Sequence, residues 1–106
     1  MTNKLHLITA VVQGKVGEEA IAAAIAAGAT GATYFGAEGT GIRQRLGPMA
    51  ANIEPSKRVI FIVVEPSRSD AVLAAVVKVA KLEDPGQGFA CVQEVLKAVG
   101  FVAARR

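Results

Sequence analysis

The chain has 106 residues, a length that suits one domain with a core of its own. Hydrophobic residues make up 52% and charged residues 20%, which excludes a disordered chain, and the mild net charge of +3 gives no indication of nucleic-acid binding. The single cysteine excludes an internal disulfide, and with it a secreted fold that depends on disulfides.

The first half of the chain predicts a strand, a helix and a second strand. Lys4 to Val12 is almost continuously apolar and β-branched, as is typical of a strand covered on at least one face. Gly17 to Ala27 is mostly alanine with two glutamates in its first turn, which predicts a helix that ends at Gly28. Thr30 to Phe35 is predicted to be the second strand. Regular structure is then expected to stop, because glycines and prolines interrupt the segment from Gly36 to Ser56.

The second half opens with the strongest strand pattern in the chain. Lys57 to Glu65 is apolar on both faces, which predicts a central position in the sheet. Pro66 ends this strand, and Ser67 with Asp70 predicts a capping pair at the start of a helix. That helix has one apolar stripe and two lysines near its end. The stripe consists of Val72, Leu73, Val76, Val77 and Ala80.

A glycine-rich break from Glu83 to Gly88 separates this helix from a last strand, Phe89 to Val92. The tail from Gln93 to Arg106 is expected to hold a short helix. The order predicts an α+β fold, a ferredoxin-like βαββαβ sandwich with helices on one face of an antiparallel sheet, as a single domain over residues 1–106. The other face is unusually apolar, and such a patch usually meets a partner or another copy of the chain.

The long loop carries the first candidate binding segment. The stretch from Gly36 to Gly41 matches neither a dinucleotide-binding fingerprint nor a P-loop. Its continuation is more informative, since backbone donors around Gly41 stand beside the side chains of Arg43, Gln44 and Arg45. Such a set suits a phosphate or a carboxylate. The alternative is a solvated loop with random charges.

The second candidate segment is Pro85-Gly86-Gln87-Gly88, which leads into the last strand. In this fold the ends of the second and fourth strands can frame a cleft between subunits. Two glycine-rich segments that converge there would surround an anionic ligand with backbone N–H groups. The alternative is an ordinary turn between a helix and a strand.

No catalytic residue and no metal site is predicted. His6 lies inside the first strand without a second ligand nearby, so we expect a hydrogen-bonded strand histidine. Cys91 lies among apolar residues and is expected to be a buried, inert thiol. Val12-Gln13-Gly14 resembles the start of the phosphate cradle of acylphosphatases, which share this fold. However, Lys15 follows where that family has an arginine, and lysine does not replace a bidentate guanidinium.

Taken together, the segments resemble the PII signal-transduction superfamily. The resemblance rests on Thr30-Gly31, on the Gly-x-Gly-x-Arg-Gln stretch from Gly39 to Gln44, and on Pro85 to Gly88, where that family has its T-loop and B-loop. It covers Lys4 to about Val95. It implies a homotrimer that binds adenine nucleotides in the clefts between subunits and signals through the T-loop to a partner protein, such as a transporter or an enzyme. The nucleotide-binding residues implied are Thr30, Gly41, Arg43, Gln44, Gly86, Gln87, Gly88 and Phe89. The effector or anion residues are Arg43, Arg45 and Arg58.

Departures from the nitrogen regulators favour a divergent PII-like protein. Phe89 stands where those proteins have a lysine after the B-loop glycine, the paired C-terminal arginines are not in register, and the T-loop tyrosine is missing. With fewer cationic groups, ADP or AMP fits better than ATP. A small anion such as bicarbonate, held by Arg43 or Arg45 beside the nucleotide, would fit the subgroup that is associated with carboxysomes and bicarbonate.

Other functions on the same fold remain alternatives. The long Gly/Arg loop and the poor metal ligands argue against a CutA-like trimer with a structural or metal-linked role. RNA recognition needs exposed aromatic side chains on the central strands, and Phe61 is the only candidate there, so no nucleic-acid partner is expected. No stretch approaches the roughly 20 apolar residues that span a bilayer. A cytoplasmic protein without direct membrane insertion is therefore expected.

Overall fold

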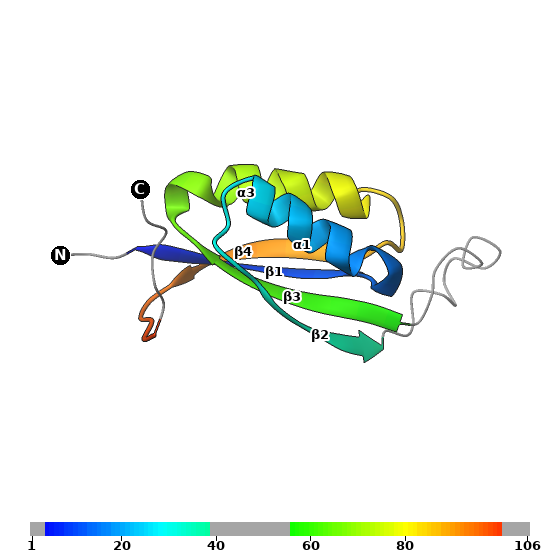
Figure 1. Cartoon of the computed structure of the whole chain (residues 1–106), viewed down its shortest axis with the longest axis horizontal. Coiled ribbons are helices and arrows are strands. Elements are labelled where there is room, and N and C mark those ends of the chain that lie inside the picture. Colours follow the sequence, from blue (N-terminus) through cyan, green and yellow to red (C-terminus); the bar gives the residue numbers. More distant parts are fainter. Residues whose placement is uncertain (1–3, 39–55, 101–106) are drawn as a thin grey trace.

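The computed structural model describes residues 4–38 and 56–100, which form a four-stranded sheet with two helices on one face (Figure 1). The strands are β1 (Leu5–Gln13), β2 (Thr33–Glu38), β3 (Ser56–Val64) and β4 (Phe89–Val95). The helices are α1 (Gly17–Ala26) and α3 (Pro66–Ala80), and a short 3-10 turn, η1 (Gly14–Val16), joins β1 to α1. The sheet order is β2-β3-β1-β4, and all neighbours are antiparallel. The predicted ferredoxin-like fold is confirmed, and the third strand is central as expected.

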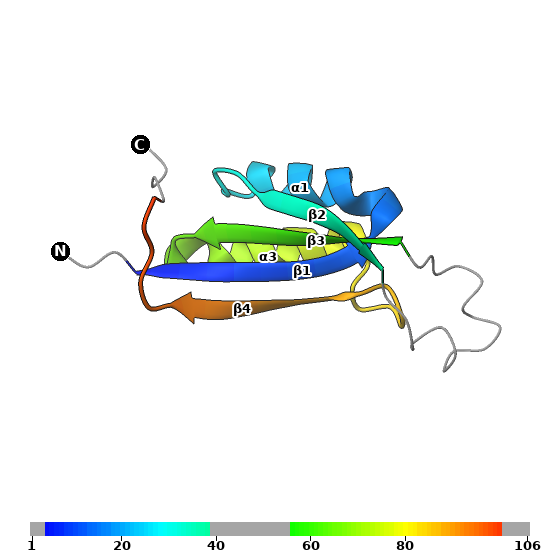
Figure 2. The same ribbon diagram turned by 90° about the horizontal axis from the view of Figure 1, so that it is seen from below.

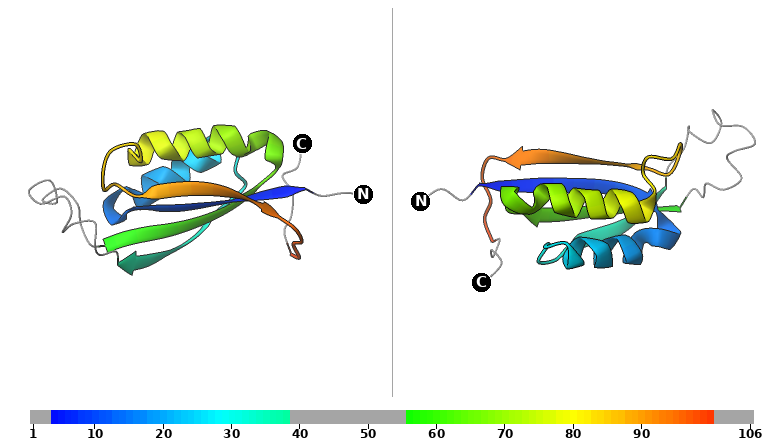
Figure 3. Two further views of the ribbon diagram at one scale, coloured as in Figure 1. Left: turned by 180° about the vertical axis from the view of Figure 1, so that it is seen from behind. Right: turned by 90° about the horizontal axis from the view of Figure 1, so that it is seen from above.

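The helix-covered face of the sheet holds the core. Both helices lie side by side above the sheet (Figure 3). Alternate residues of β1 and β3 point toward them and are fully or almost fully buried, as the period of two in a strand requires. Alanines on α1 allow its backbone to approach the sheet closely. The core consists of Ile8, Ala10, Val12, Ala20, Ala24, Ala29, Ile60, Ile62, Val64, Val72, Val76 and Ala80.

The opposite face of the sheet is open along its length (Figure 2). Directly opposed residues on neighbouring strands share a face, so the ladder register identifies what lies there. One row is Phe35, Val59, Val11 and Phe89, and the next is Thr33, Phe61, Thr9 and Cys91. Three phenylalanines are substantially exposed on this face, at 48%, 37% and 56% for Phe35, Phe61 and Phe89. In the sequence analysis, only Phe61 had been named as an exposed aromatic side chain on the central strands.

Four details of the sequence prediction were wrong. β2 begins at Thr33 rather than Thr30 and continues to Glu38, because pairing with β3 extends as far as Ser56 and overrides the poor strand propensity of Gly36. Cys91 is exposed, because its ladder position opposite Thr9 turns it toward the open face. The other two details concern the start of α3 and the end of the last strand.

The start of α3 uses proline instead of the predicted cap. Glu65 is the N-cap residue without a side-chain cap bond, and Pro66 begins the helix, where its missing N–H has no cost. The predicted Ser67–Asp70 pair is therefore absent from this helix start. The last strand, β4, continues through Gln93 to Val95 instead of ending at Val92. Residues 96–100 contain no helix, and the expected short helix of the tail stays a prediction for the residues beyond them. Residues 101–106 lie outside the described part.

Truncation of a core isoleucine tests the assignment of the covered face. Ile60→Ala removes a fully buried side chain and leaves a cavity, so the free energy of unfolding should fall by about 2–5 kcal/mol. The matched control is Ile25→Ala, the same substitution at a position that is 48% exposed on α1, where a change of about 0.5 kcal/mol is expected. Chemical denaturation measures both variants. Equal losses would contradict the assignment.

Candidate functional site

The candidate site lies at one end of the sheet, where the end of β1, the start of β3 and the loop between α3 and β4 meet (Figure 1). The chain also enters and leaves the long loop at this end, since β2 stops at Glu38 and β3 starts at Ser56. Four predicted site residues, Gly41, Arg43, Gln44 and Arg45, lie outside the described residues. The described part of the site is therefore built from β1, β3 and the loop that contains Gly86, Gln87 and Gly88.

A buried glutamine side chain joins these three segments. The amide nitrogen of Gln13, Nε2, donates to the backbone oxygen of Gly86 at 3.1 Å and to that of Gln87 at 3.2 Å. The amide oxygen, Oε1, accepts from Nζ of Lys57 at 3.2 Å. Gln13 is fully buried, and Lys57 is 7% exposed. The two residues are direct partners in the β1–β3 ladder, so backbone pairing brings their side chains together.

The last residues of the glycine-rich loop adopt a backbone conformation that favours glycine. Gly86 has φ +80° and Gly88 has φ +135°. A Cβ atom added to Gly88 would collide with the backbone oxygen of Val11. The N–H of Gln87 donates to the backbone oxygen of Asp84 at 3.3 Å and closes a turn within the loop. The predicted segment is thus held tightly against β1, and Phe89 follows it with 56% of its surface exposed.

Arg58 lies on the other face of the sheet from this cluster. Its guanidinium carbon is 5.2 Å from the centre of the Tyr34 ring, a cation–π distance. A Cβ atom on Gly17 would lie 2.7 Å from its side chain, so the arginine stem passes close over the start of α1. Strand alternation separates Arg58 from Lys57, which points toward the glycine-rich loop. An anion-binding role for Arg58 stays a prediction.

Thr30 lines a cavity at the opposite end of the sheet. The cavity has a volume of about 360 Å³ and an open mouth. Its lining residues are Thr30, Gly31, Ala32, Thr33, Phe61, Val63 and Gly100. The start of β2 is four ladder positions from the row of Lys57, and β2 is separated from β4 by β3 and β1. Strand geometry then puts Thr30 roughly 20 Å from the glycine-rich loop of the same chain. The structure therefore does not bring these two predicted nucleotide contacts together within one subunit.

The hydrogen bonds of His6 agree with a structural role. Nδ1 of His6 lies 3.0 Å from Oγ of Ser69, and that hydroxyl donates to the backbone oxygen of Pro66, also at 3.0 Å. The hydroxyl has one proton, so it accepts from the Nδ1–H of His6. The expected hydrogen-bonded strand histidine is confirmed. Within residues 4–38 and 56–100, no three His, Cys, Asp or Glu side chains group closely enough to hold a metal ion.

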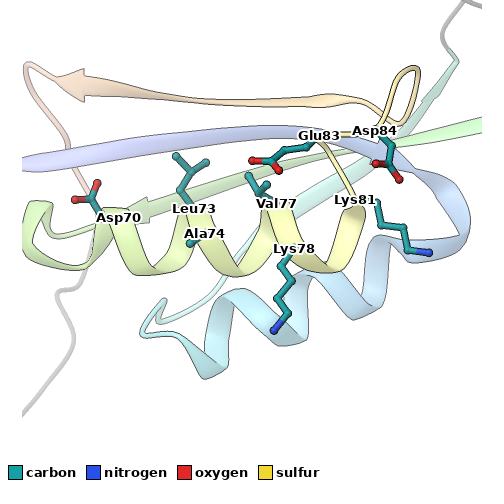
Figure 4. A pocket seen from close by; sticks show the side chains of 8 residues that line it. All are labelled: Asp70, Leu73, Ala74, Val77, Lys78, Lys81, Glu83 and Asp84. Carbon is teal, nitrogen blue, oxygen red and sulfur yellow. The ribbon is translucent and has the colours of Figure 1, made fainter.

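A larger hollow of about 530 Å³ lies beside α3 (Figure 4). Leu73, Ala74 and Val77 form its apolar part, and charged side chains of both signs surround them. The charged residues are Asp70, Lys78, Lys81, Glu83 and Asp84. None of the predicted site residues lines this hollow. In the described part of the chain, neither helix is long and apolar enough to cross a membrane.

Comparison with known proteins decides the family. The model of the family described as "Nitrogen regulatory protein P-II" matches residues 5–101. The chain belongs to the P-II family. It is thus a member of a family of signalling regulators. The match to this family over residues 5–101 favours a P-II protein over the acylphosphatase and CutA alternatives. Among curated protein sequences, no match was found.

Solved P-II structures share the fold. A GlnK–ATP complex from B. subtilis superposes with a TM-score of 0.66 at 23% identity, covering 89% of this chain and 85% of GlnK. Arabidopsis thaliana PII bound to citrate superposes with a TM-score of 0.64 at 19% identity, covering 85% of this chain and 76% of that protein. At these identities the likeness establishes the P-II fold and not a particular ligand.

Sequence reasoning missed two residues of the candidate P-II site, Gln13 and Lys57. In the sequence analysis, Gln13 was considered only as part of a resemblance to the acylphosphatase cradle. A signal for both was present, because each is a polar residue at the loop-side end of an otherwise apolar strand. Their pairing depends on the ladder register, which the sequence does not specify on its own.

The requirement for glycine at position 88 can be tested by substitution. Gly88→Ala forces an L residue into φ +135° and against the Val11 carbonyl, so the free energy of unfolding should fall by at least about 2 kcal/mol. The matched control is Gly36→Ala, because a Cβ there meets nothing within 4 Å and a change below about 1 kcal/mol is expected. Thermal and urea unfolding measure both variants. A Gly88→Ala protein as stable as the control would contradict the tight placement of this loop.

Proposed function

We propose that this P-II protein is a trimeric regulator that binds an adenine nucleotide between subunits and signals to a partner protein through its T-loop. The observation that carries the proposal is the constellation of the glycine-rich loop, Gln13 and the buried Lys57 at the loop end of the sheet. A tight glycine-rich loop beside a cation suits a phosphate group. The ATP complex of the similar GlnK supports this ligand class.

The phosphate end of the site favours ADP or AMP over ATP. Phe89 follows the loop, and it supplies an apolar side chain where a cation would contact a further phosphate. Arg58 faces the helix-covered side and packs on Tyr34. Lys57 is the cation that is hydrogen-bonded to this loop through Gln13. A ligand with fewer phosphates matches such a site better than a triphosphate.

A small anion is proposed as a second ligand. Arg43 and Arg45 from the T-loop would hold it beside the nucleotide. Arg58, the third anion residue that the resemblance implies, faces the helix-covered side and is a separate candidate. Bicarbonate is the proposed anion, because planar guanidinium groups bind planar oxyanions through paired hydrogen bonds. The similar plant PII was solved bound to citrate, a carboxylate anion, which supports an oxyanion as a ligand class.

The trimer is proposed because one chain holds only part of the nucleotide site. Thr30 and the cavity beside it lie roughly 20 Å from Gly88, by strand spacing, and one nucleoside diphosphate does not bridge that separation. A neighbouring copy can place its Thr30 cavity beside the glycine-rich loop. The open sheet face, with its exposed phenylalanines, provides apolar surface for association.

Signalling would follow from ligand contacts at the base of the T-loop. Gly41, Arg43 and Gln44 are proposed to contact the nucleotide and thereby to fix the segment that follows Glu38. Ligand binding would then change the surface offered to the partner protein, a transporter or an enzyme, by selecting one arrangement of that segment.

Calorimetry with AMP, ADP and ATP tests the ligand. ADP and AMP are expected to bind with sub-millimolar dissociation constants and ATP more weakly. Bicarbonate should tighten binding of the preferred nucleotide, because both ligands are proposed to bind the same T-loop base, and by linkage the nucleotide should tighten bicarbonate binding by the same factor. Chloride at equal ionic strength is the control for bicarbonate, and 2-oxoglutarate is the competing effector. Absence of sub-millimolar binding by every nucleotide would refute the proposal.

Subunit mixing tests the shared site. Thr30→Arg should block the adenine side, and Gln87→Glu should repel phosphate at the glycine-rich loop, so each variant alone should lose most ADP binding. In a trimer where each site takes Thr30 from one subunit and the loop from its neighbour, every mixed trimer regains one intact site. The measurement is ADP binding after joint refolding, with hydrodynamic mass as the check on assembly. A mass near that of one chain, or no recovery on mixing, would contradict the arrangement.

A further inference from the structure

The side chain of Gln13 binds both hydrogen-bond acceptors and a hydrogen-bond donor, and a single amide group can serve both. The backbone oxygens of Gly86 and Gln87 only accept hydrogen bonds, and Nζ of Lys57 only donates them. An amide has a donor end and an acceptor end, and these partners fix which end points where. A carboxylate would lack the donors, and an ammonium would lack the acceptor. The chemistry of the three contacts therefore specifies an amide at this position.

The contact with Gln87 also sets the direction of a backbone donor. In a trans peptide the C=O and the following N–H point in opposite directions, and the described residues contain no cis bond. Since the C=O of Gln87 points to the buried amide of Gln13, the N–H of Gly88 points away from it. The N–H of Gln87 is occupied by Asp84, which closes the turn. Gln13 thus orients the Gly88 donor.

The end of β1 holds the loop at two independent points. Val11 limits Gly88 by close backbone contact, and Gln13, two residues later, binds the carbonyls before it. The Lys57 ammonium is attached to the same amide from the β3 side. A shift of the loop would break its bonds to Gln13, and a shift of the start of β3 would break the Lys57 bond.

We propose that Gln13 is a positioning residue that holds the Gly88 amide donor and the Lys57 ammonium in one fixed arrangement for the phosphate groups of the nucleotide. It touches no ligand itself. The ligand part of this inference rests on the proposed nucleotide function, whereas the orientation of the loop by Gln13 does not. Because Lys57 stands directly after Ser56 at the exit of the T-loop, the same amide also links the T-loop base to the glycine-rich loop.

Two substitutions separate the two functions of the Gln13 amide, which are to bind the loop carbonyls and to bind Lys57. Gln13→Met keeps the length of the side chain and removes its hydrogen bonds to Gly86, Gln87 and Lys57. Gln13→Glu keeps an acceptor for Lys57 but places a carboxylate oxygen against the oxygens of Gly86 and Gln87, so the loop should be released while the bond to Lys57 remains. The matched control is Ser69→Ala, which removes another buried polar group at the far end of the sheet.

The first measurement is amide hydrogen exchange in the ligand-free protein. Exchange across residues 86–89 should accelerate about tenfold or more in both Gln13 variants, because each loses hydrogen bonds to the loop, and it should match the wild type in Ser69→Ala. The second measurement is the affinity for ADP relative to that for adenosine, which lacks phosphates. This ratio should fall about tenfold in both Gln13 variants and stay constant in the control.

The outcomes separate the inference from the proposed function. Unchanged exchange at residues 86–89, or acceleration no greater than in Ser69→Ala, would overturn the positioning role whether or not nucleotide binds. An equal fall in ADP and adenosine affinity would reduce Gln13 to a general stability residue. If the wild-type protein binds no nucleotide, the proposed function fails, and hydrogen exchange still decides the positioning role. If Gln13→Met does not fold, the near-isosteric Gln13→Glu carries the test.

Discussion

The antiparallel register of β1 against β3 is the constraint on which the rest of the structure depends. It places Gln13 opposite Lys57, and Ala10 opposite Ile60, so polar pairs at the loop end and apolar pairs in the core follow from one alignment. A slip by one residue would turn every side chain of β1 to the other face. It would bury Gln13 and Thr9 under the helices and expose Ile8. The fully buried isoleucines on one face hold the polar cluster in place on the other.

Much of this fold could be predicted from the sequence, and the reasons are local. The apolar run from Lys57 to Glu65 and the alanine-rich helix indicate their structures through composition and periodicity. The failures are all consequences of tertiary pairing or of competition at element ends. β2 reaches Glu38 because β3 is available to pair with it, and α3 begins at Pro66 because proline there is already suited to the first turn.

The sequence predicted the glycine-rich part of the candidate site but not which strand side chains point toward it. Glycine-rich segments are visible as composition, so Gly86 and Gly88 were identified before their positive φ angles were known. The choice between Lys57 and Arg58 was not visible, because neighbouring residues on a strand point to opposite faces and the open face was not yet assigned. Arg58 was named as an anion residue through the family resemblance, yet the pleat turns Lys57 toward the glycine-rich loop and Arg58 toward Tyr34.

The side chain at position 13 is a neutral amide, and this affects the charge near Lys57. A glutamate there would also accept from Lys57, but it would bring a negative charge to the same place and cancel the ammonium toward any anion nearby. Gln13 accepts the same hydrogen bond and adds no net charge. Burial strengthens this effect, because charge interactions are screened less at a position that is 7% exposed than at the surface. The amide therefore fixes the lysine in space without neutralising it, which is the property that an anion site beside the glycine-rich loop requires.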